Sequence, residues 1–158
     1  MKSGVCAAYC HGGFMTKSEK AVQCHIEGFN CSQAVFSAYS GECGLSVETA
    51  KKIASGFGGG MGRLCETCGA VTGAFMVIGL MFSTGTADKE NKEKIYAMIR
   101  DFANRFRERN KTIKCEDLLG VNLLTGDREL SSRQVKTVCP KVIGDSAEIL
   151  DEMLKNQP

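Results

Sequence analysis

An apolar run from Gly69 to Phe82 determines the architecture that this chain can adopt. The run is shorter than the roughly 20 residues that a helix needs to cross a bilayer, so we expect a buried core helix and no membrane span. We place this helix at about 68–84, with Gly85 as its stop signal. Because it is apolar on nearly every side, other elements must cover it. The sequence therefore predicts a central helix with the remaining helices packed around it.

Helical spacing of apolar residues recurs along the rest of the chain, and no stretch of useful length alternates as a strand would. The clearest stripe runs from Ile95 to Phe106 and follows Asp88, which can cap a long helix. After a polar, irregular stretch at about 120–133, Pro140 suits the first position of a last helix. The sequence therefore predicts an all-α fold, in which a single domain forms a helical bundle around the central helix.

The composition agrees with one globular domain. The chain has 158 residues, of which 43% are hydrophobic and 24% are charged, which is typical of a chain with its own core. We assign 21–155 to the helical domain and 1–20 to an N-terminal extension. A net charge of +2 is too small to indicate a nucleic-acid partner. No sustained apolar segment of the secretory type follows Met1, so we expect a cytoplasmic protein.

Nine cysteines point to sulfur chemistry. Structural disulfides are rare in the cytoplasm, so we expect thiols that are free, redox-active or bound to metal. Cys65 and Cys68 form a Cys-x-x-Cys pair between a glycine-rich loop and the central helix. Glycines allow the backbone to come close to bound sulfur or an anion. The candidate cofactor-binding glycines are Gly58, Gly59, Gly60, Gly62, Gly69 and Gly73.

Three cysteines share one kind of expected location, because Cys31, Cys68 and Cys139 each fall at a predicted helix start. There the helix dipole and the unpaired N–H groups favour a thiolate. Cys115 lies just beyond the basic end of the long helix. A single cysteine often only fills space in a core, however, and a lone Cys-x-x-Cys fits redox dithiols, zinc half-sites and cluster ligands alike.

Several motifs, taken in order, make the chain similar to the small C-GCAxxG-C-C proteins, a redox-active family. They are Gly28-Phe29-Asn30-Cys31-Ser32-Gln33-Ala34-Val35, then 54–62, then Cys68-Gly69-Ala70-Val71-Thr72-Gly73, and finally Cys115 and Cys139. The resemblance extends from about Ala21 to Leu154 and maps the family's characteristic cysteines onto Cys31, Cys68, Cys115 and Cys139. It implies a redox role without an assigned reaction. A similar domain in split-Soret cytochromes implies an iron–sulfur cluster, for which four thiolates are the usual complement.

Different classes of function remain open. In the first, the four cysteines bind an iron–sulfur cluster for electron transfer. In the second, Cys68 attacks a disulfide, and Cys65 or another of the family cysteines resolves the intermediate. A structural metal site in an accessory protein is the third. We slightly favour the cluster, because a dithiol needs two cysteines and this pattern recruits four. No general base, catalytic carboxylate pair or phosphate loop is evident, so an enzymatic role is left undecided.

The remaining motifs bear on partners. The basic stretch from Arg100 to Lys114 is best interpreted as a solvated helix face, with a docking patch for an acidic electron-transfer partner as the alternative. We therefore expect an unidentified redox partner protein, and a homodimer is left open. Cys6, Cys10 and His11 miss the haem-attachment motif by one residue, and attachment of haem c needs export, so haem is not expected. His25 is interpreted as a satisfied or solvent-facing histidine.

Overall fold

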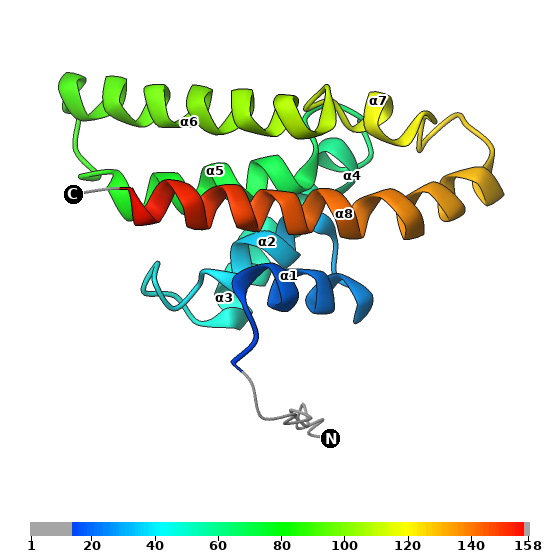
Figure 1. The fold of residues 1–158 in the computed structure, drawn as a ribbon, viewed down its shortest axis with the longest axis horizontal. Helices are drawn as coiled ribbons and strands as arrows, with labels where there is room; N and C mark the ends of the chain where they lie inside the picture. The colour runs from blue at the N-terminus through cyan, green and yellow to red at the C-terminus, as the bar shows by residue number, and fades with distance from the viewer. Residues whose placement is uncertain (1–13, 157–158) are drawn as a thin grey trace.

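Long helices dominate the computed structural model, which describes residues 14–156 (Figure 1). Within this range no β-strand forms, and the predicted all-α fold is confirmed. The helices are α1 (Lys17–Ile26), α2 (Cys31–Ala38), α3 (Val47–Ala54), α4 (Gly58–Met61), α5 (Gly69–Phe82), α6 (Lys89–Asn110), α7 (Cys115–Leu119) and α8 (Arg128–Lys155), with a 3₁₀ turn η1 (Ser55–Phe57) before α4.

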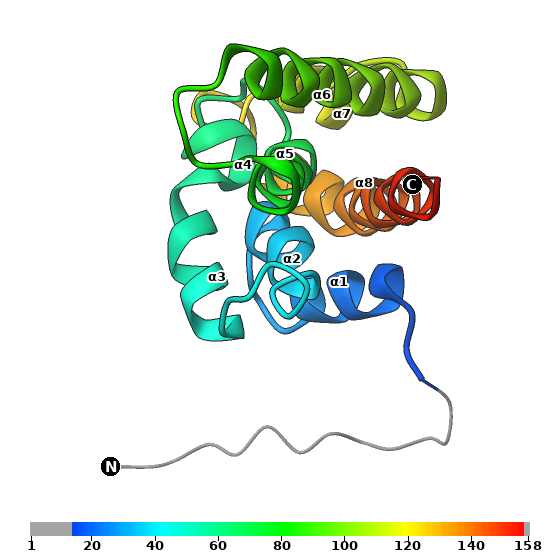
Figure 2. The same cartoon turned by 90° about the vertical axis from the view of Figure 1, so that its left-hand side faces the viewer.

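The α5 helix is the centre of the bundle. Figure 2 shows it nearly end-on, with α6 above it, α8 beside it and α2 below, and it contacts all three. Its side chains from Gly69 to Ala74 are buried without interruption. The predicted central helix is therefore confirmed, although it begins at Gly69 and ends at Phe82, two residues short of the expected end.

The α6 helix covers α5 with the apolar stripe that its sequence predicted. Asp88 caps it by accepting a hydrogen bond from the Glu90 backbone N–H at 2.9 Å. Phe102 and Phe106 are fully buried. Phe102 also meets Phe75 of α5 edge to face, with ring centroids 5.9 Å apart. Aromatic packing of this kind joins the two layers.

The α8 helix corrects the sequence-based prediction for the last element. It begins at Arg128, because Asp127 caps it by accepting a hydrogen bond from the Leu130 N–H at 2.7 Å. Pro140 lies inside this helix and is not its first residue. One proline removes only one backbone hydrogen bond, and the apolar face around it continues into the core. Cys139 is therefore a mid-helix residue, and the expectation that it lies at a helix N-terminus is wrong.

No helix within residues 14–156 is both long enough and apolar enough to span a membrane.

Candidate functional site

The position of Cys31 follows from the cap of α2. The Asn30 side chain accepts a hydrogen bond from the Gln33 N–H, and the Gln33 side chain accepts one from the Asn30 N–H, both at 3.0 Å. This reciprocal cap satisfies two backbone donors of the first turn. The Asn30 amide also donates to the Ser55 carbonyl at 2.9 Å, which ties the start of α2 to η1. Cys31 is thereby held as the first residue of its helix, as predicted.

A left-handed turn forms the glycine-rich loop. Consecutive residues 59–63 all have φ between 63° and 69°, and Cys65 has φ 62°. Glycine adopts this conformation readily, whereas Met61 and Arg63 do so at a cost of about 1–2 kcal/mol each. The turn closes with a hydrogen bond from the Gly62 N–H to the Gly58 carbonyl at 2.9 Å. Both cysteines of the Cys-x-x-Cys segment that follows the turn are buried.

A short antiparallel pairing then aligns the Cys-x-x-Cys segment with the residues that precede α7. The pairing is an isolated bridge between Thr67 and Lys114. The Cys68 N–H donates to the Ile113 carbonyl at 2.8 Å, and the Cys115 N–H donates to the Glu66 carbonyl at 2.7 Å. These bonds place Cys68 and Cys115 on adjacent stretches of backbone, although 46 intervening residues separate them in the sequence.

The glycines that the sequence singled out allow this packing. A Cβ at Gly69 would overlap the Cys31 sulfur, and one at Gly58 would overlap the Asn30 side chain. At Gly60, a Cβ would lie 2.7 Å from the Cys115 Cβ and 2.8 Å from the Cys65 carbonyl carbon.

The other candidate glycines have different environments. Gly73 lies against the Ser32 carbonyl, whereas Gly59 and Gly62 have positive φ. Contact between these glycines and a cofactor stays a prediction.

The Cys31 and Cys68 side chains form a hydrogen-bonded pair. Cys68 donates a hydrogen bond to Cys31, and this lowers the pKa of Cys31 to about 6 against the opposing effect of burial. Hydrogen bonds from the Gly59 and Ser32 backbone and the charge of His25 act in the same direction. The same hydrogen bond, together with burial, raises the pKa of Cys68 well above its usual range. The pair is therefore asymmetric, with the pKa lowered at Cys31 and raised at Cys68. The sequence-based hypothesis that Cys68 is the reactive thiol stays a prediction.

Cys115 and Cys139 are neutral thiols in this arrangement. Burial raises the pKa of each to about 12, and the negative charge of Cys31 adds to the effect. Both belong to the hydrophobic core that also contains Cys31 and Cys68. The four family positions are thus in one core and near enough to influence one another electrostatically.

The fit of these residues to a metal can be judged from their placement. Among residues 14–156, no group of three or more His, Cys, Asp or Glu side chains is arranged to hold a metal ion. The cysteines of the core supply thiolate sulfurs, which are the ligands of iron–sulfur clusters. In the present side-chain positions, however, these sulfurs do not surround a common metal position. Binding would require the sulfurs to approach one another.

His25 affects the pKa of Cys31, although the sequence predicted only a satisfied or solvent-facing histidine. Its Nδ1 lies 2.8 Å from the Phe29 carbonyl oxygen in the turn that leads to Cys31. Its charge also lowers the pKa of Cys31. His25 and Cys31 are six residues apart in the sequence, with the end of α1 between them. No sequence pattern indicates that two such residues interact.

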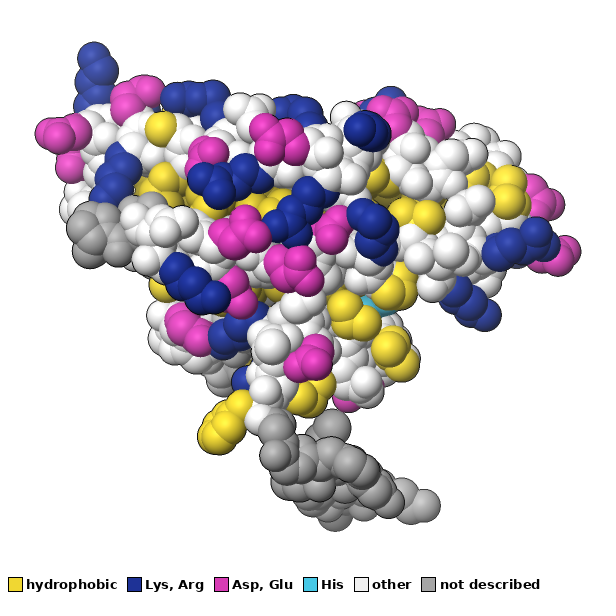
Figure 3. Space-filling model, viewed as in Figure 1, with side chains coloured by type: hydrophobic (Ala, Val, Ile, Leu, Met, Phe, Trp, Pro, Cys, Tyr) yellow, Lys and Arg dark blue, Asp and Glu magenta, His cyan; other side chains and the backbone are white. Residues whose placement is uncertain are grey.

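The basic stretch at Arg100–Lys114 is partly neutralised. Arg105 pairs with Asp101 at 3.1 Å, and Arg109 reaches two glutamates of α8, Glu148 at 2.9 Å and Glu152 at 2.6 Å. Figure 3 shows acidic and basic side chains interspersed on the face where α6 and α8 lie. This arrangement favours a solvated helix face over a docking patch. The haem-like residues Cys6, Cys10 and His11 lie outside the described residues.

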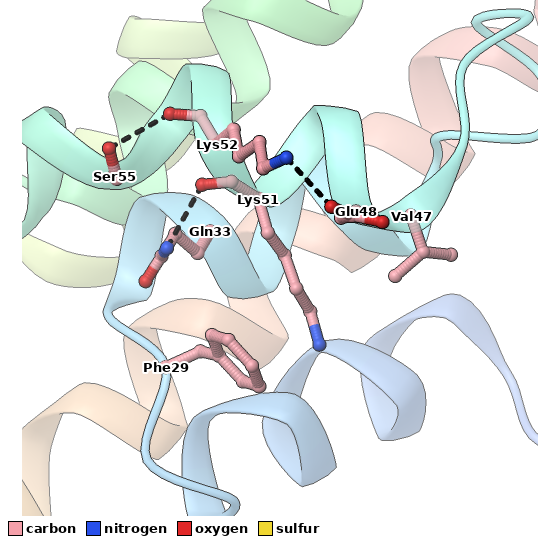
Figure 4. A pocket seen from close by; sticks show the side chains of 7 residues that line it. All are labelled: Phe29, Gln33, Val47, Glu48, Lys51, Lys52 and Ser55. Carbon is pink, nitrogen blue, oxygen red and sulfur yellow. Dashed lines mark hydrogen bonds and ion pairs between the residues drawn. The ribbon is translucent and has the colours of Figure 1, made fainter. Parts of the chain in front are cut away.

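A surface hollow lies next to α2, and it is distinct from the sulfur core. Its volume is about 610 Å³, and no cysteine lines it. The Lys51 ammonium lies 3.5 Å from the centroid of the Phe29 ring, and the Gln33 amide donates to the Lys51 carbonyl at 2.9 Å (Figure 4). These contacts fasten α3 to the start of α2 and so support the position of Cys31.

Comparisons with known proteins give matches over most of the chain. A family model described as "Putative redox-active protein (C_GCAxxG_C_C)" matches residues 29–153. A protein of Archaeoglobus fulgidus, named as an uncharacterized protein, is 28% identical over 155 residues, which cover 90% of this chain and 99% of the relative. No solved structure gives a significant match.

Proposed function

The chain belongs to the C_GCAxxG_C_C family of redox-active proteins, and from this premise we propose that it performs thiol–disulfide exchange at Cys31 and Cys68. The observation that carries the proposal is the hydrogen-bonded sulfur pair at the starts of α2 and α5. Gly69 supports it, because its missing side chain leaves room for the Cys31 sulfur. A thiolate beside a protonated thiol is the arrangement that such exchange requires.

The two cysteines have different roles in the proposed reaction. The Cys31 thiolate attacks one sulfur of a partner disulfide, so a mixed disulfide forms and one partner thiolate leaves. Cys68 then loses its proton and attacks the Cys31 sulfur, which releases the second partner thiolate and closes the Cys31–Cys68 disulfide. Two electrons pass from the protein to the partner, and the reverse sequence oxidises the partner. Cys31 is the attacking residue because the thiolate is the nucleophile.

Disulfide mapping tests this proposal. An endoproteinase that cleaves after glutamate places Cys31 on fragment 28–42 and Cys68 on fragment 67–90. After exposure of the reduced protein to a disulfide oxidant, we expect these two fragments to be linked. Cys31→Ser and Cys68→Ser should each abolish the link, whereas Cys24→Ser, in another buried cysteine, should leave it intact. An oxidised protein in which neither fragment is cross-linked to the other would contradict the proposal.

An iron–sulfur cluster on Cys31, Cys68, Cys115 and Cys139 is the second candidate. The observation that favours it is that Cys115 and Cys139 are buried in the same core as the pair and are influenced by its charge. A two-cysteine reaction would not need them. When bound, the cluster would supply one-electron transfer, with the four cysteines as its ligands.

Anaerobic reconstitution with iron and sulfide separates the two candidates. If the cluster forms, the protein should become coloured, contain iron and sulfide in fixed proportion, and lose the colour in Cys139→Ser. The Cys31–Cys68 link should survive that same substitution, because Cys139 has no part in the exchange reaction. A colourless protein after reconstitution would count against the cluster.

A further inference from the structure

Cys65 is a buried thiol that lies outside the four family positions. It is 1% exposed, and its backbone has a φ of 62°. The Leu123 backbone N–H donates to its sulfur at 3.2 Å, and the sulfur in turn contacts the Arg63 carbonyl at 3.5 Å. These contacts come from both sides of the loop and hold the sulfur in one position. A left-handed conformation in a non-glycine residue costs about 1–2 kcal/mol, so the surrounding contacts must offset that cost.

Cys115 is the cysteine that the backbone brings next to Cys65. Across the bridge Cys115 pairs with Glu66, the residue that follows Cys65, and the Glu116 N–H donates to the Cys65 carbonyl at 3.3 Å. The two cysteines also come close at Gly60, where an added Cβ would lie 2.7 Å from the Cys115 Cβ and 2.8 Å from the backbone carbonyl carbon of Cys65. Cys65 is among the groups that raise the pKa of Cys115.

Cys68 is already engaged elsewhere. Its side chain donates to Cys31, and its backbone N–H donates to the Ile113 carbonyl at 2.8 Å. It is the N-cap residue of α5 and lies in the core with Cys31 and Cys115, whereas the Cys65 sulfur is held by Leu123 and Arg63. The two cysteines of the Cys-x-x-Cys sequence are therefore divided between different neighbours.

We infer that Cys65 and Cys115 form a second redox dithiol, which closes its own disulfide when the protein reacts with a peroxide. This inference is independent of the exchange reaction proposed for Cys31 and Cys68. One of the two thiols loses its proton, and the thiolate sulfur attacks a peroxide oxygen. The O–O bond breaks, and a sulfenic acid forms while the proton leaves with the other oxygen as one water. The sulfur of the other thiol displaces the sulfenic oxygen as a second water, and the S–S bond closes. Two electrons pass from the sulfurs to the peroxide, and both thiol protons end in water.

Peptide mapping after treatment with hydrogen peroxide tests the inference. Cleavage after glutamate cuts between Cys65 and Cys68 at Glu66, so Cys65 is on fragment 49–66 and Cys115 is on fragment 109–116. With enough peroxide to oxidise both cysteine pairs, followed by alkylation of the remaining thiols, we expect fragments 49–66 and 109–116 to be linked. A link from 49–66 to the fragment that contains Cys68 would overturn the inference, and so would full alkylation of Cys65 after oxidation.

Variants separate this pair from the proposed exchange pair. Cys115→Ser should abolish the link completely, and so should Cys65→Gly, which preserves the left-handed backbone that residue 65 adopts. Cys43→Ser, in a partly buried cysteine between α2 and α3, is the matched control and should leave it intact. Cys31→Ser should also leave it intact, although it abolishes the exchange reaction. Loss of the Cys65–Cys115 link in Cys31→Ser would contradict the inference, whereas failure of the Cys31–Cys68 link alone would contradict only the proposed exchange.

Discussion

The thiolate character of Cys31 depends on groups that are distant from it in the sequence. Its largest single influence is the hydrogen bond from Cys68, at the start of a different helix. The Gly59 backbone contributes from the left-handed turn, and His25 contributes from the end of α1. Burial acts against all of these, since it disfavours a charged sulfur. The charge on Cys31 is therefore a property of the assembled site.

A pair of substitutions at Cys68 tests this origin. The wild-type Cys31 thiolate should appear as the pH rises through about 6, because that is where its lowered pKa lies. Cys68→Ala removes the hydrogen-bond donor, so the thiolate should appear only at higher pH. Cys68→Ser keeps a donor and should preserve much of the lowering. Ultraviolet absorbance of the thiolate, taken as the difference from Cys31→Ser at each pH, measures the change.

An unchanged titration in Cys68→Ala would show that the donor is not the cause. Cys24→Ala is the matched control, because Cys24 is also a buried cysteine but does not contribute to the pKa of Cys31.

At the scale of elements, the glycines at the two ends of the α5 helix have different surroundings. Its first turn packs so closely on α2 that side chains are excluded at Gly69 and Gly73. Its last turns carry Gly79, around which no atom lies within 4 Å of an added Cβ. Glycine therefore has different effects at the two ends of the helix. Near the site, glycine is required because α2 packs closely against α5. Near the C-terminal end of α5, glycine lowers the stability of the helix without a packing benefit.

Alanine substitutions in α5 should have opposite effects. Gly69→Ala should destabilise the protein by about 1–3 kcal/mol, because the added Cβ would meet the Cys31 sulfur and backbone atoms that cannot easily move. Gly79→Ala should stabilise it by about 0.5–1 kcal/mol, since alanine is the better helix former and has open space there. Urea unfolding of both variants measures the difference. Equal effects of the two substitutions would be inconsistent with a packing origin.

At the scale of the whole molecule, buried polar contacts align the helices that carry the cysteines. The Tyr39 hydroxyl, just after α2, lies 2.7 Å from the Ala147 carbonyl and 2.8 Å from Asp151, both on α8. Tyr39 is itself almost fully buried. This contact joins the end of α2, which begins with Cys31, to α8, which carries Cys139.

Removal of the Tyr39 hydroxyl should lower the global stability of the protein. Tyr39→Phe should lower the free energy of unfolding by about 1 kcal/mol, which is the usual net value of a buried hydrogen bond. Tyr96→Phe is the control, because Tyr96 is 50% exposed, and it should have little effect. Burial, aided by Asp151, raises the pKa of Tyr39 far above its usual range. The free energy of unfolding of the wild type should therefore fall above pH of about 10, where Tyr39 ionises in the unfolded chain but not in the folded protein. In the same pH range, the difference in stability between the wild type and Tyr39→Phe should become smaller.

Thermal or urea unfolding at several pH values measures both parts of that expectation. A Tyr39→Phe variant as stable as the wild type near neutral pH would show that the contact with α8 contributes nothing net.

The sequence by itself determined the central helix, because an apolar run of that length can only be buried. It also determined the stripe of α6, whose spacing is a local property of the chain, and the family resemblance singled out Cys31, Cys68, Cys115 and Cys139. Pro140 misled the assignment of α8, since its preference for a helix start was outweighed by the cap at Asp127 and by continued packing on the core.

Only the tertiary structure decided how the pKa values of Cys31 and Cys68 are shifted and which cysteines are neighbours. Cys65 and Cys68 are three residues apart, yet the left-handed turn and the bridge to Lys114 give them different surroundings. Helix dipoles and burial can be anticipated from local pattern, but hydrogen bonds and charge–charge interactions depend on distance through space. The chemistry of Cys31 therefore arises from contacts that form only when α1, α2, α5 and the glycine loop have packed together.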